Sequence, residues 1–184
     1  MRVIAGSARR LNLVTPKGYD TRPTTDKSKE TLFNCLMPYV PGARFLDIFA
    51  GSGAIGIEAL SRGAEYAAFC EQSKEALDCI EKNLKTTHLF DGAGIYKGDA
   101  FSSLRTLEGR ENFDIIFMDP PFNKGLEESV LRYLASSSLI NDDTVIVVEA
   151  SNETDFDYAT GLGFEVFKLK QYKNNKHVFF RKAE

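Results

Sequence analysis

Apolar residues follow two alternating patterns along most of the chain. Runs of about five consecutive apolar residues indicate strands that are buried on both faces, whereas apolar residues at every third or fourth position indicate helices with one apolar side. Strands are expected at 44–49, 66–70, 93–97, 113–118 and 144–148. Helices are expected to begin at Ala54, at Ser73 and after Gly125. This alternation predicts a doubly wound α/β fold, in which right-handed crossovers bring the carboxyl ends of the parallel strands to one edge.

The N-terminal part adds two elements before the first of these strands. Residues 2–5 and 10–14 alternate apolar with polar or basic positions on either side of a Gly-Ser-Ala turn, which predicts a small β-hairpin. Thr25 or Asp26 can cap a helix that runs to about Met37, after which prolines follow.

The C-terminal part closes the predicted sheet. Segments 164–168 and 178–180 have the pattern of two short strands joined by a polar connection. The predicted fold class is therefore a Rossmann-like α/β fold: a seven-stranded, mostly parallel sheet with helices on both faces, plus an N-terminal β-hairpin. We expect a single domain over residues 1–184, in which 1–25 form the hairpin extension and 26–184 form the α/β core.

Charge is distributed unevenly along the chain. The net charge is −3, but residues 1–30 hold seven Lys or Arg against three Asp or Glu, and residues 168–184 hold six against one. Basic ends on an acidic body are typical of a localised contact with a polyanion. Solvated basic ends explain the same charges equally well when charge is the only evidence.

Several classes of protein and site are disfavoured by composition. The chain has no apolar run of about 18 residues, so no membrane span is expected, and its first residues lack the apolar core of a signal peptide. Cys35, Cys70 and Cys79 form an odd, scattered set, which favours reduced thiols in the cytoplasm. His88 and His177 lie away from the motifs described below, so no metal site is expected.

A glycine-rich segment follows the first core strand and opens the next helix. A strand, a glycine turn and a helix N-terminus together present backbone N–H groups to a ligand. Gly51, Gly53 and Gly56 also satisfy the G-x-G-x-x-G pattern of dinucleotide sites. Asp47 argues against that ligand, because a carboxylate at this strand would repel a pyrophosphate and would suit a positively charged group such as the ammonium of S-adenosylmethionine. A dinucleotide oxidoreductase therefore stays a distant alternative.

Acidic residues stand at the ends of the next two strands. Glu71 follows Gly51 by 20 residues, a distance at which an acidic side chain can bind both ribose hydroxyls. Asp99 can accept a hydrogen bond from an adenine amine, while the N–H of Ala100 faces a ring nitrogen. Each acidic residue alone is better explained as a helix cap or a solvated loop charge. Their position at one shared edge favours a cofactor site.

The segment Asp119-Pro120-Pro121-Phe122 follows the fourth core strand. Two successive prolines restrict the backbone, so that the Asp119 carboxylate and the Pro120 carbonyl can both accept hydrogen bonds from one amino group. Phe122 offers a ring on which a planar base can stack. Two acceptors favour tetrahedral geometry at a conjugated amine and free its lone pair for attack on a methyl group, and Asp119 opposes the positive charge that develops on nitrogen.

At these residues the sequence resembles the class I S-adenosylmethionine-dependent methyltransferases that act on exocyclic amines. It is most similar to the RsmD family of bacterial 16S rRNA guanine-N2 methyltransferases. The resemblance covers nearly the whole chain and is carried by segments 2–6, 22–26, 32–34, 46–53, 98–99 and 119–122. It implies transfer of a methyl group to the N2 amine of a guanine in 16S rRNA, at a guanine 966-type site.

Candidate site residues fall into three groups. The catalytic residues are expected to be Asp119, Pro120, Pro121 and Phe122. The residues that bind S-adenosylmethionine are expected to be Asp47, Phe49, Ala50, Gly51, Ser52, Gly53, Glu71, Asp99 and Ala100. The residues that bind RNA are expected to be Arg2, Arg9, Arg10, Arg22 and Lys173. The expected partner is 16S rRNA, free or in a partly assembled small ribosomal subunit, and the protein is expected to be a cytoplasmic monomer without a metal.

Two alternative functions stay open at this point. The nearest is an adenine-N6 methyltransferase of DNA or RNA, because the same Asp-Pro-Pro-aromatic loop serves both reactions. The other is an RNA-binding module that has lost its activity. The four acidic residues at the strand ends, Asp47, Glu71, Asp99 and Asp119, disfavour this alternative.

Overall fold

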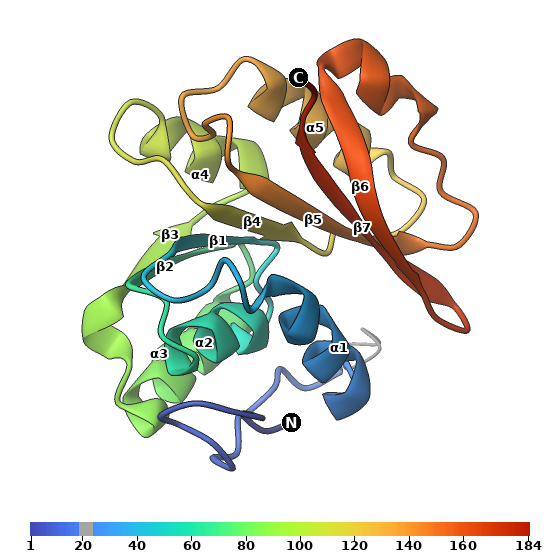
Figure 1. Ribbon diagram of the computed structural model, residues 1–184. Coiled ribbons are helices and arrows are strands. Elements are labelled where there is room, and N and C mark those ends of the chain that lie inside the picture. Colours follow the sequence, from blue (N-terminus) through green and yellow to red (C-terminus); the bar gives the residue numbers. More distant parts are fainter. Residues whose placement is uncertain (19–23) are drawn as a thin grey trace.

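A seven-stranded sheet in the order β3-β2-β1-β4-β5-β7-β6 forms the centre of the computed structural model (Figure 1). The model describes residues 1–18 and 24–184. The strands are β1 Arg44–Ile48, β2 Tyr66–Glu71, β3 Ala93–Lys97, β4 Ile115–Met118, β5 Val145–Ser151, β6 Phe164–Gln171 and β7 Asn175–Lys182. Strands β1 to β5 pair in parallel, and β7 pairs antiparallel with both β5 and β6. The predicted mostly parallel, seven-stranded sheet is thereby confirmed.

Helices cover both faces of this sheet, as predicted. The α-helices are α1 Asp26–Leu36, α2 Ala54–Ser61, α3 Lys74–Thr87, α4 Ala100–Leu107 and α5 Leu126–Ala135, and two short 3₁₀ helices span Phe90–Gly92 and Asp157–Leu162. In Figure 1, α1, α2 and α3 lie below the sheet, and α4 and α5 lie above it. None of the helices in the described ranges is long and apolar enough to cross a lipid bilayer.

Two apolar layers result from the alternation of side chains along each strand. Phe45 and Phe117 pack in the layer between the sheet and α1, α2 and α3. Leu46 and Ile116 pack in the layer between the sheet and α4 and α5. Successive residues of a strand point to opposite faces, so a strand covered on both sides needs apolar residues at consecutive positions. That requirement explains the continuous apolar runs in the sequence.

Helix starts agree closely with the capping residues in the sequence. Thr25 caps α1, and its hydroxyl accepts a hydrogen bond from the Ser28 N–H at 3.1 Å. Ser73 caps α3 in the same way through the Ala76 N–H. Helix α4 was not among the predicted helices, although a helix cap was one of the interpretations of Asp99.

The N-terminal segment pairs with itself less extensively than a regular hairpin. Arg2 and Asn12 form an isolated antiparallel bridge, and the Leu13 N–H donates to the Met1 carbonyl at 2.8 Å. Further along the first half of this segment, the backbone N–H groups of Ile4 and Ala5 donate to the side chain of Glu58 on α2, at 3.0 and 3.1 Å, and not to a partner strand. Helix α2 therefore takes the place that a partner strand would have in a longer hairpin.

A buried charged cluster fastens this segment to the core. The carboxylate of Glu58 also accepts from Arg62 Nε at 2.9 Å and lies 3.3 Å from Lys29 Nζ, and both Lys29 and Glu58 are fully buried. Lys29 Nζ in turn donates to the Arg2 carbonyl at 2.5 Å. Burial lowers the pKa of Lys29, which the neighbouring Glu58 partly offsets. The path of the basic N-terminal segment is thus determined by contacts with α1 and α2.

Gly6 permits the closest approach between this segment and α2. Its φ of +85° lies in the left-handed region, and a Cβ at this position would lie 1.7 Å from the Ser61 carbonyl oxygen. Only glycine satisfies both conditions. The neighbouring Ser7 N–H donates to that same carbonyl at 2.8 Å.

Candidate active site

The glycine turn lies at the carboxyl edge of β1 and leads directly into α2. Phe49, Gly51 and Gly53 all have positive φ values, of 62°, 57° and 79°. A Cβ added at Gly51 would meet no atom within 4 Å, so there is open space beside this residue. Gly56 has a different function, since a Cβ there would lie 2.4 Å from the Phe69 ring. The turn therefore leaves room for a ligand, while the third glycine lets α2 pack closely on β2.

Asp47 lies beneath this turn. Its carboxylate is 1% exposed and accepts a hydrogen bond from the Gly56 N–H at 3.0 Å. Burial is the main cause that raises the pKa of Asp47 well above its ordinary value, and Glu71 adds to the rise. The carboxyl group thus holds α2 against β1. The argument from the sequence assumed a charged carboxylate at Asp47, whereas the raised pKa favours the neutral carboxyl group. Contact between Asp47 and a ligand ammonium therefore stays a prediction.

Glu71 joins the glycine turn to the end of β2. Its Oε2 accepts from the Gly51 N–H at 2.8 Å, and its Oε1 accepts from the N–H groups of Gln72 and Ser73 at 2.8 and 2.9 Å. These bonds orient the carboxylate at the edge of the sheet, and Oε2, which accepts only one of them, keeps a further lone pair. The structure brings Glu71 and the glycines together, as the sequence predicted, whereas ribose binding by Glu71 stays a prediction.

Asp99 caps helix α4. Its Oδ1 accepts from the Ser102 N–H at 3.0 Å, and this hydrogen bond is the largest cause that lowers the pKa of Asp99. The helix-cap interpretation that the sequence left open is therefore the one the structure supports for this side chain. Ala100 is the first residue of α4, so its N–H lies at a helix N-terminus. Adenine binding by these two residues stays a prediction.

Asp119 lies directly after β4, at the same edge of the sheet. Burial raises the pKa of Asp119 well above its ordinary value, and the carboxylates of Glu149 and Asp47 raise it further. Within the ranges 1–18 and 24–184, no hydrogen-bond donor reaches its carboxylate. Two adjacent prolines follow, of which Pro120 is buried, and the Phe122 ring is 44% exposed. This loop thus combines an acceptor without a donor and an exposed aromatic ring.

Two residues beside Asp119 were missed in the sequence. Glu149 lies on β5, and His177 lies opposite it on β7, fully buried and with Nε2 at 3.1 Å from Glu149 Oε2. An acidic residue near the end of the fifth core strand was a signal that could have identified Glu149. No local signal identified His177, because its partner is 28 residues away in the sequence.

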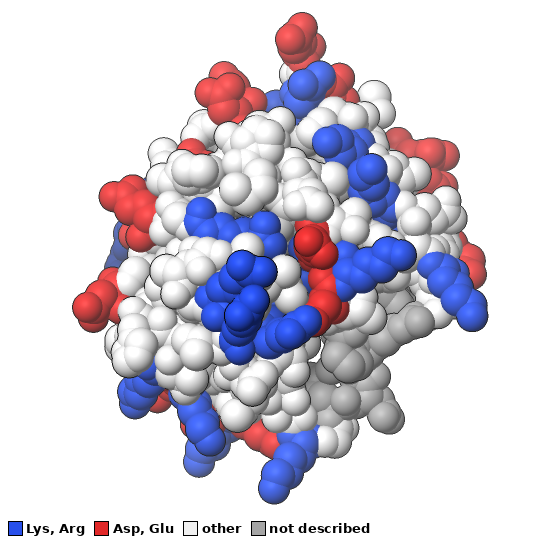
Figure 2. All heavy atoms as spheres, turned by 60° about the horizontal axis from the view of Figure 1, so that its bottom comes forward, with Lys and Arg blue, Asp and Glu red and all other residues white. Residues whose placement is uncertain are grey.

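The predicted RNA-binding residues lie mostly on the N-terminal segment. Arg2, Arg9 and Arg10 surround a hollow of about 260 Å³ together with two apolar residues of the same segment. Arg2 forms an exposed ion pair with Asp26 at 2.9 Å, and Arg9 and Arg10 are exposed. Figure 2 is turned so that the bottom of the molecule in Figure 1 comes forward, and it shows a group of Lys and Arg side chains on this face.

The other two predicted RNA contacts lie elsewhere. Lys173 is exposed in the turn between β6 and β7. Arg22 lies outside the described residues. RNA binding by any of these five residues stays a prediction.

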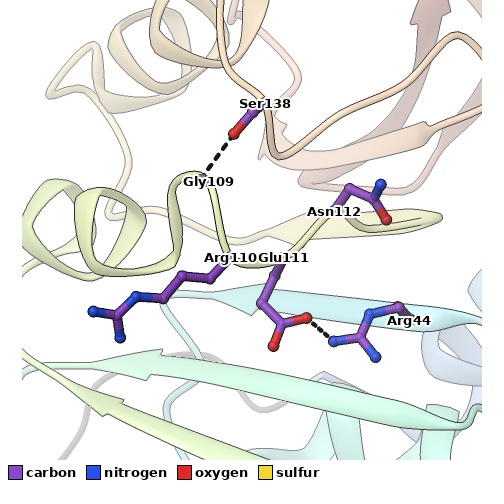
Figure 3. Close-up of a pocket in the computed structure, with 6 residues that line it drawn as sticks. All are labelled: Arg44, Gly109, Arg110, Glu111, Asn112 and Ser138. Carbon is purple, nitrogen blue, oxygen red and sulfur yellow. Dashed lines mark hydrogen bonds and ion pairs between the residues drawn. The ribbon is translucent and has the colours of Figure 1, made fainter.

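A larger hollow lies at the opposite edge of the sheet. It has a volume of about 380 Å³ and is lined by Arg44, Gly109, Arg110, Glu111, Asn112 and Ser138 (Figure 3). Arg44 forms an ion pair with Glu111, and the Gly109 N–H donates to Ser138 Oγ at 2.9 Å. Since Arg44 begins β1, this hollow is separated from the glycine turn by the full length of that strand. It is not the candidate active site.

No metal centre is found in the described part of the chain, where no group of three or more His, Cys, Asp or Glu side chains could hold a metal ion. The chemistry available at the carboxyl edge is that of carboxylates, backbone N–H groups and an aromatic ring. These groups can orient a ligand and an amine, and they can accept a proton.

Known proteins with similar sequences cover most of the chain. The family described as "Conserved hypothetical protein 95" matches residues 1–181. The ribosomal RNA small subunit methyltransferase D of Escherichia coli is 39% identical over 153 residues, which are 83% of this chain and 76% of that protein. The enzyme of the same name from Haemophilus influenzae is 36% identical and matches 83% of this chain and 80% of that protein.

Solved structures with a similar fold also cover most of the chain. The yhhF protein of Escherichia coli has a TM-score of 0.88 and 33% sequence identity, over 100% of this chain and 98% of that one. Trm5b from Pyrococcus abyssi, at 22% identity and a TM-score of 0.69, shares the fold alone. With an Asp-Pro-Pro-Phe loop beside a glycine turn, in a fold shared with class I methyltransferases, the chain belongs to the RsmD family of small-subunit ribosomal RNA methyltransferases.

Proposed function

We propose that this protein transfers a methyl group from S-adenosylmethionine to the N2 amine of a guanine in 16S rRNA. The observation that carries the proposal is the Asp119 carboxylate, which lies at the carboxyl edge without a donor among the described residues and is followed by two prolines and an exposed Phe122. Membership of the RsmD family supports ribosomal RNA as the substrate.

The residues of the glycine turn fit the proposed methyl donor. Open space beside Gly51 leaves room for the donor, and Glu71 is oriented at the turn by the Gly51 N–H. In this proposal Glu71 binds the ribose hydroxyls, and Asp99 with Ala100 binds the adenine. When bound, S-adenosylmethionine supplies an electrophilic methyl group on a positively charged sulfur.

The Asp-Pro-Pro-Phe loop prepares the amine. The lone pair of an exocyclic amine is delocalised into the base, which makes the nitrogen a poor nucleophile. Asp119 and the Pro120 carbonyl accept the two N–H hydrogens, so that the lone pair is directed out of the base plane. Asp119 also opposes the positive charge on nitrogen in the transition state. Phe122 stacks on the base and fixes its orientation.

The test is to map methylated nucleotides in rRNA from cells with and without the gene. The proposal predicts that one N2-methylguanine of 16S rRNA disappears when the gene is deleted and returns with a plasmid copy. Loss of an N6-methyladenine instead would establish the alternative adenine-N6 activity. Assays with purified protein on naked 16S rRNA and on partly assembled small subunits identify the substrate form. We also propose that the protein acts as a monomer in the cytoplasm, where ribosomes are assembled.

Cofactor binding gives a direct prediction. Isothermal titration calorimetry is expected to detect binding of S-adenosylmethionine and of its demethylated product, because the turn and Glu71 suit a ligand without a pyrophosphate. Nicotinamide dinucleotides are expected to show no heat of binding. Tight binding of a nicotinamide dinucleotide would contradict the assignment of the glycine turn.

RNA binding by the N-terminal arginines gives a second prediction. Arg9→Ala and Arg10→Ala are each expected to weaken RNA binding at any sequence. They should also reduce the slope of log affinity against log salt by about 0.7 to 0.9, because each phosphate contact releases counterions. Arg22→Ala extends the series to the residue outside the described ranges.

The matched control for this series is Arg110→Ala, an exposed arginine at the opposite edge of the sheet. The control is expected to keep the wild-type slope. If Arg9→Ala, Arg10→Ala and Arg22→Ala all keep it too, the basic N-terminal segment is only a solvated surface and RNA binds elsewhere.

A further inference from the structure

Asn83 is a buried amide on a mostly apolar face of helix α3. It shares this face with Ile80 and Leu84, which are fully buried in the core, and Asn83 itself is 1% exposed. Burial of an amide costs free energy unless its polar atoms form hydrogen bonds, whereas a leucine at this position would pack without that cost. Packing alone therefore does not explain an asparagine here.

The amide of Asn83 joins two segments that are distant in the sequence. Its Oδ1 accepts from the Val14 N–H at 2.8 Å, and its Nδ2 donates to the Val14 carbonyl at 2.9 Å and to the Ser52 carbonyl at 3.0 Å. The reversed amide orientation would place the NH₂ group against the Val14 N–H, which is itself a donor. One side chain thus connects the basic N-terminal segment with the glycine turn.

The glycine turn has an unusual backbone conformation that contacts from two neighbouring elements maintain. Phe49 has a φ of 62°, which is uncommon for a residue with a side chain. On the side of β2, the Ala50 N–H donates to the Cys70 carbonyl at 3.0 Å, and the Glu71 carboxylate accepts from the turn. On the side of α3, Asn83 donates to the turn. A backbone of this kind persists only where the surrounding structure holds it in place.

The N-terminal segment is fixed by the same amide. Val14 uses both of its backbone groups in this contact, as it would with a neighbouring strand. Three residues later, the Lys17 N–H donates to the Glu75 carboxylate in the first turn of α3, at 2.6 Å. In Figure 1 the N-terminal segment, in dark blue, passes below α2 and α3. The segment that holds the N-terminal arginines therefore continues along α3 and is joined to the glycine turn at Asn83.

We propose that Asn83 is a positioning residue for the methyl donor, which holds the glycine turn in its binding conformation and fixes it relative to the N-terminal segment. Because Asn83 is buried, it acts through the Ser52 carbonyl and not by contact with the donor. Without this bond the turn occupies its binding conformation for only a fraction of the time, and the apparent affinity falls by that fraction. The bound donor restores the conformation, so the chemical step keeps its rate. The inference rests on the proposed function.

The first test measures donor binding and methylation in Asn83→Leu, which keeps the approximate size of the side chain and removes its three hydrogen bonds. Calorimetry is expected to show binding of the demethylated product weakened by about 3- to 10-fold, the effect of losing one hydrogen bond to the turn. In single-turnover methylation of 16S rRNA, the donor concentration at half-maximal rate should rise by the same factor. The rate at saturating donor should stay within about two-fold of wild type.

Thr87→Val is the matched control on the same helix. Thr87 is 4% exposed, and its hydroxyl donates to the Asn83 carbonyl at 2.8 Å, within α3. The variant removes a buried polar group without changing a contact of the glycine turn, so its donor affinity should match wild type. Loss of donor affinity in Thr87→Val equal to that in Asn83→Leu would show a general structural effect and overturn the inference.

Asn83→Ala is the second variant, because water can enter the space it leaves and bind the freed carbonyl groups. It therefore tests the inference even where the apolar leucine prevents folding. Donor binding should again be weaker than in wild type. Wild-type donor affinity in either folded variant of Asn83 would overturn the inference.

A readout without ligands distinguishes failure of the inference from failure of the proposed function. Trypsin is expected to cleave native Asn83→Leu after Lys17 about five-fold or more faster than wild type, because Val14 loses both of its bonds to α3 and the segment opens locally. Thr87→Val should be cleaved at the wild-type rate. Unchanged cleavage of Asn83→Leu overturns the inference even when wild type methylates rRNA. Faster cleavage together with a wild type that binds neither the donor nor its demethylated product rejects the proposed function instead.

Discussion

Replacement of Asp119 by alanine is expected to lower the turnover number by roughly 100-fold or more, with little change in the affinity for S-adenosylmethionine. In the proposed mechanism Asp119 contacts the amine and opposes the charge that develops on nitrogen. Such an interaction is strongest in the transition state, so its loss lowers the turnover number rather than ground-state binding. In the same proposal the donor is bound by the glycine turn, Glu71 and Asp99, which the substitution leaves in place.

Single-turnover kinetics and calorimetry on the same preparation measure the two quantities. Asp119→Asn keeps the size of the side chain and one acceptor oxygen but removes the charge, so its rate should lie between those of wild type and Asp119→Ala. Asp142→Ala is the matched control, because the Asp142 side chain is 92% exposed and forms an ion pair with Lys182 at the surface. Activity of Asp119→Ala within a few-fold of wild type would contradict the assigned role.

Replacement of Glu58 by alanine is expected to lower the free energy of unfolding by about 3–5 kcal/mol, the usual cost of leaving one partner of a buried ion pair without the other. The fully buried Lys29 would lose its partner, and the N–H groups of Ile4 and Ala5 would lose their acceptors. Urea denaturation measures the change. Release of the N-terminal segment should also weaken RNA binding, because this segment holds Arg9 and Arg10.

Two further variants test the cause of this loss. Glu58→Gln keeps an oxygen that can accept from the backbone, so it is expected to lose less stability than Glu58→Ala. Glu65→Ala removes an exposed carboxylate seven residues further along the chain and should change the free energy of unfolding by less than about 0.5 kcal/mol. A loss below about 1 kcal/mol in Glu58→Ala would mean that the cluster does not hold the segment.

Local patterns determined much of the fold. Consecutive apolar residues identified the core strands, because a strand covered on both faces needs them, and the capping residues Thr25 and Ser73 gave the starts of α1 and α3. The glycine turn and the Asp-Pro-Pro-Phe loop were also recognisable, because the conformations and chemistry they need depend on a few adjacent residues. In these segments sequence and structure agree for reasons that involve only neighbouring positions.

Other features depended on which distant residues the fold brings together. Glu58 receives the backbone N–H groups of Ile4 and Ala5 from more than 50 positions away, which shortened the predicted hairpin. His177 reaches Glu149 only because β7 pairs with β5 in one register. Periodicity assigns a residue to a face of its strand, but it specifies neither the neighbouring strand nor the register. The N-terminal anchor and the contact between His177 and Glu149 were therefore decided by tertiary packing alone.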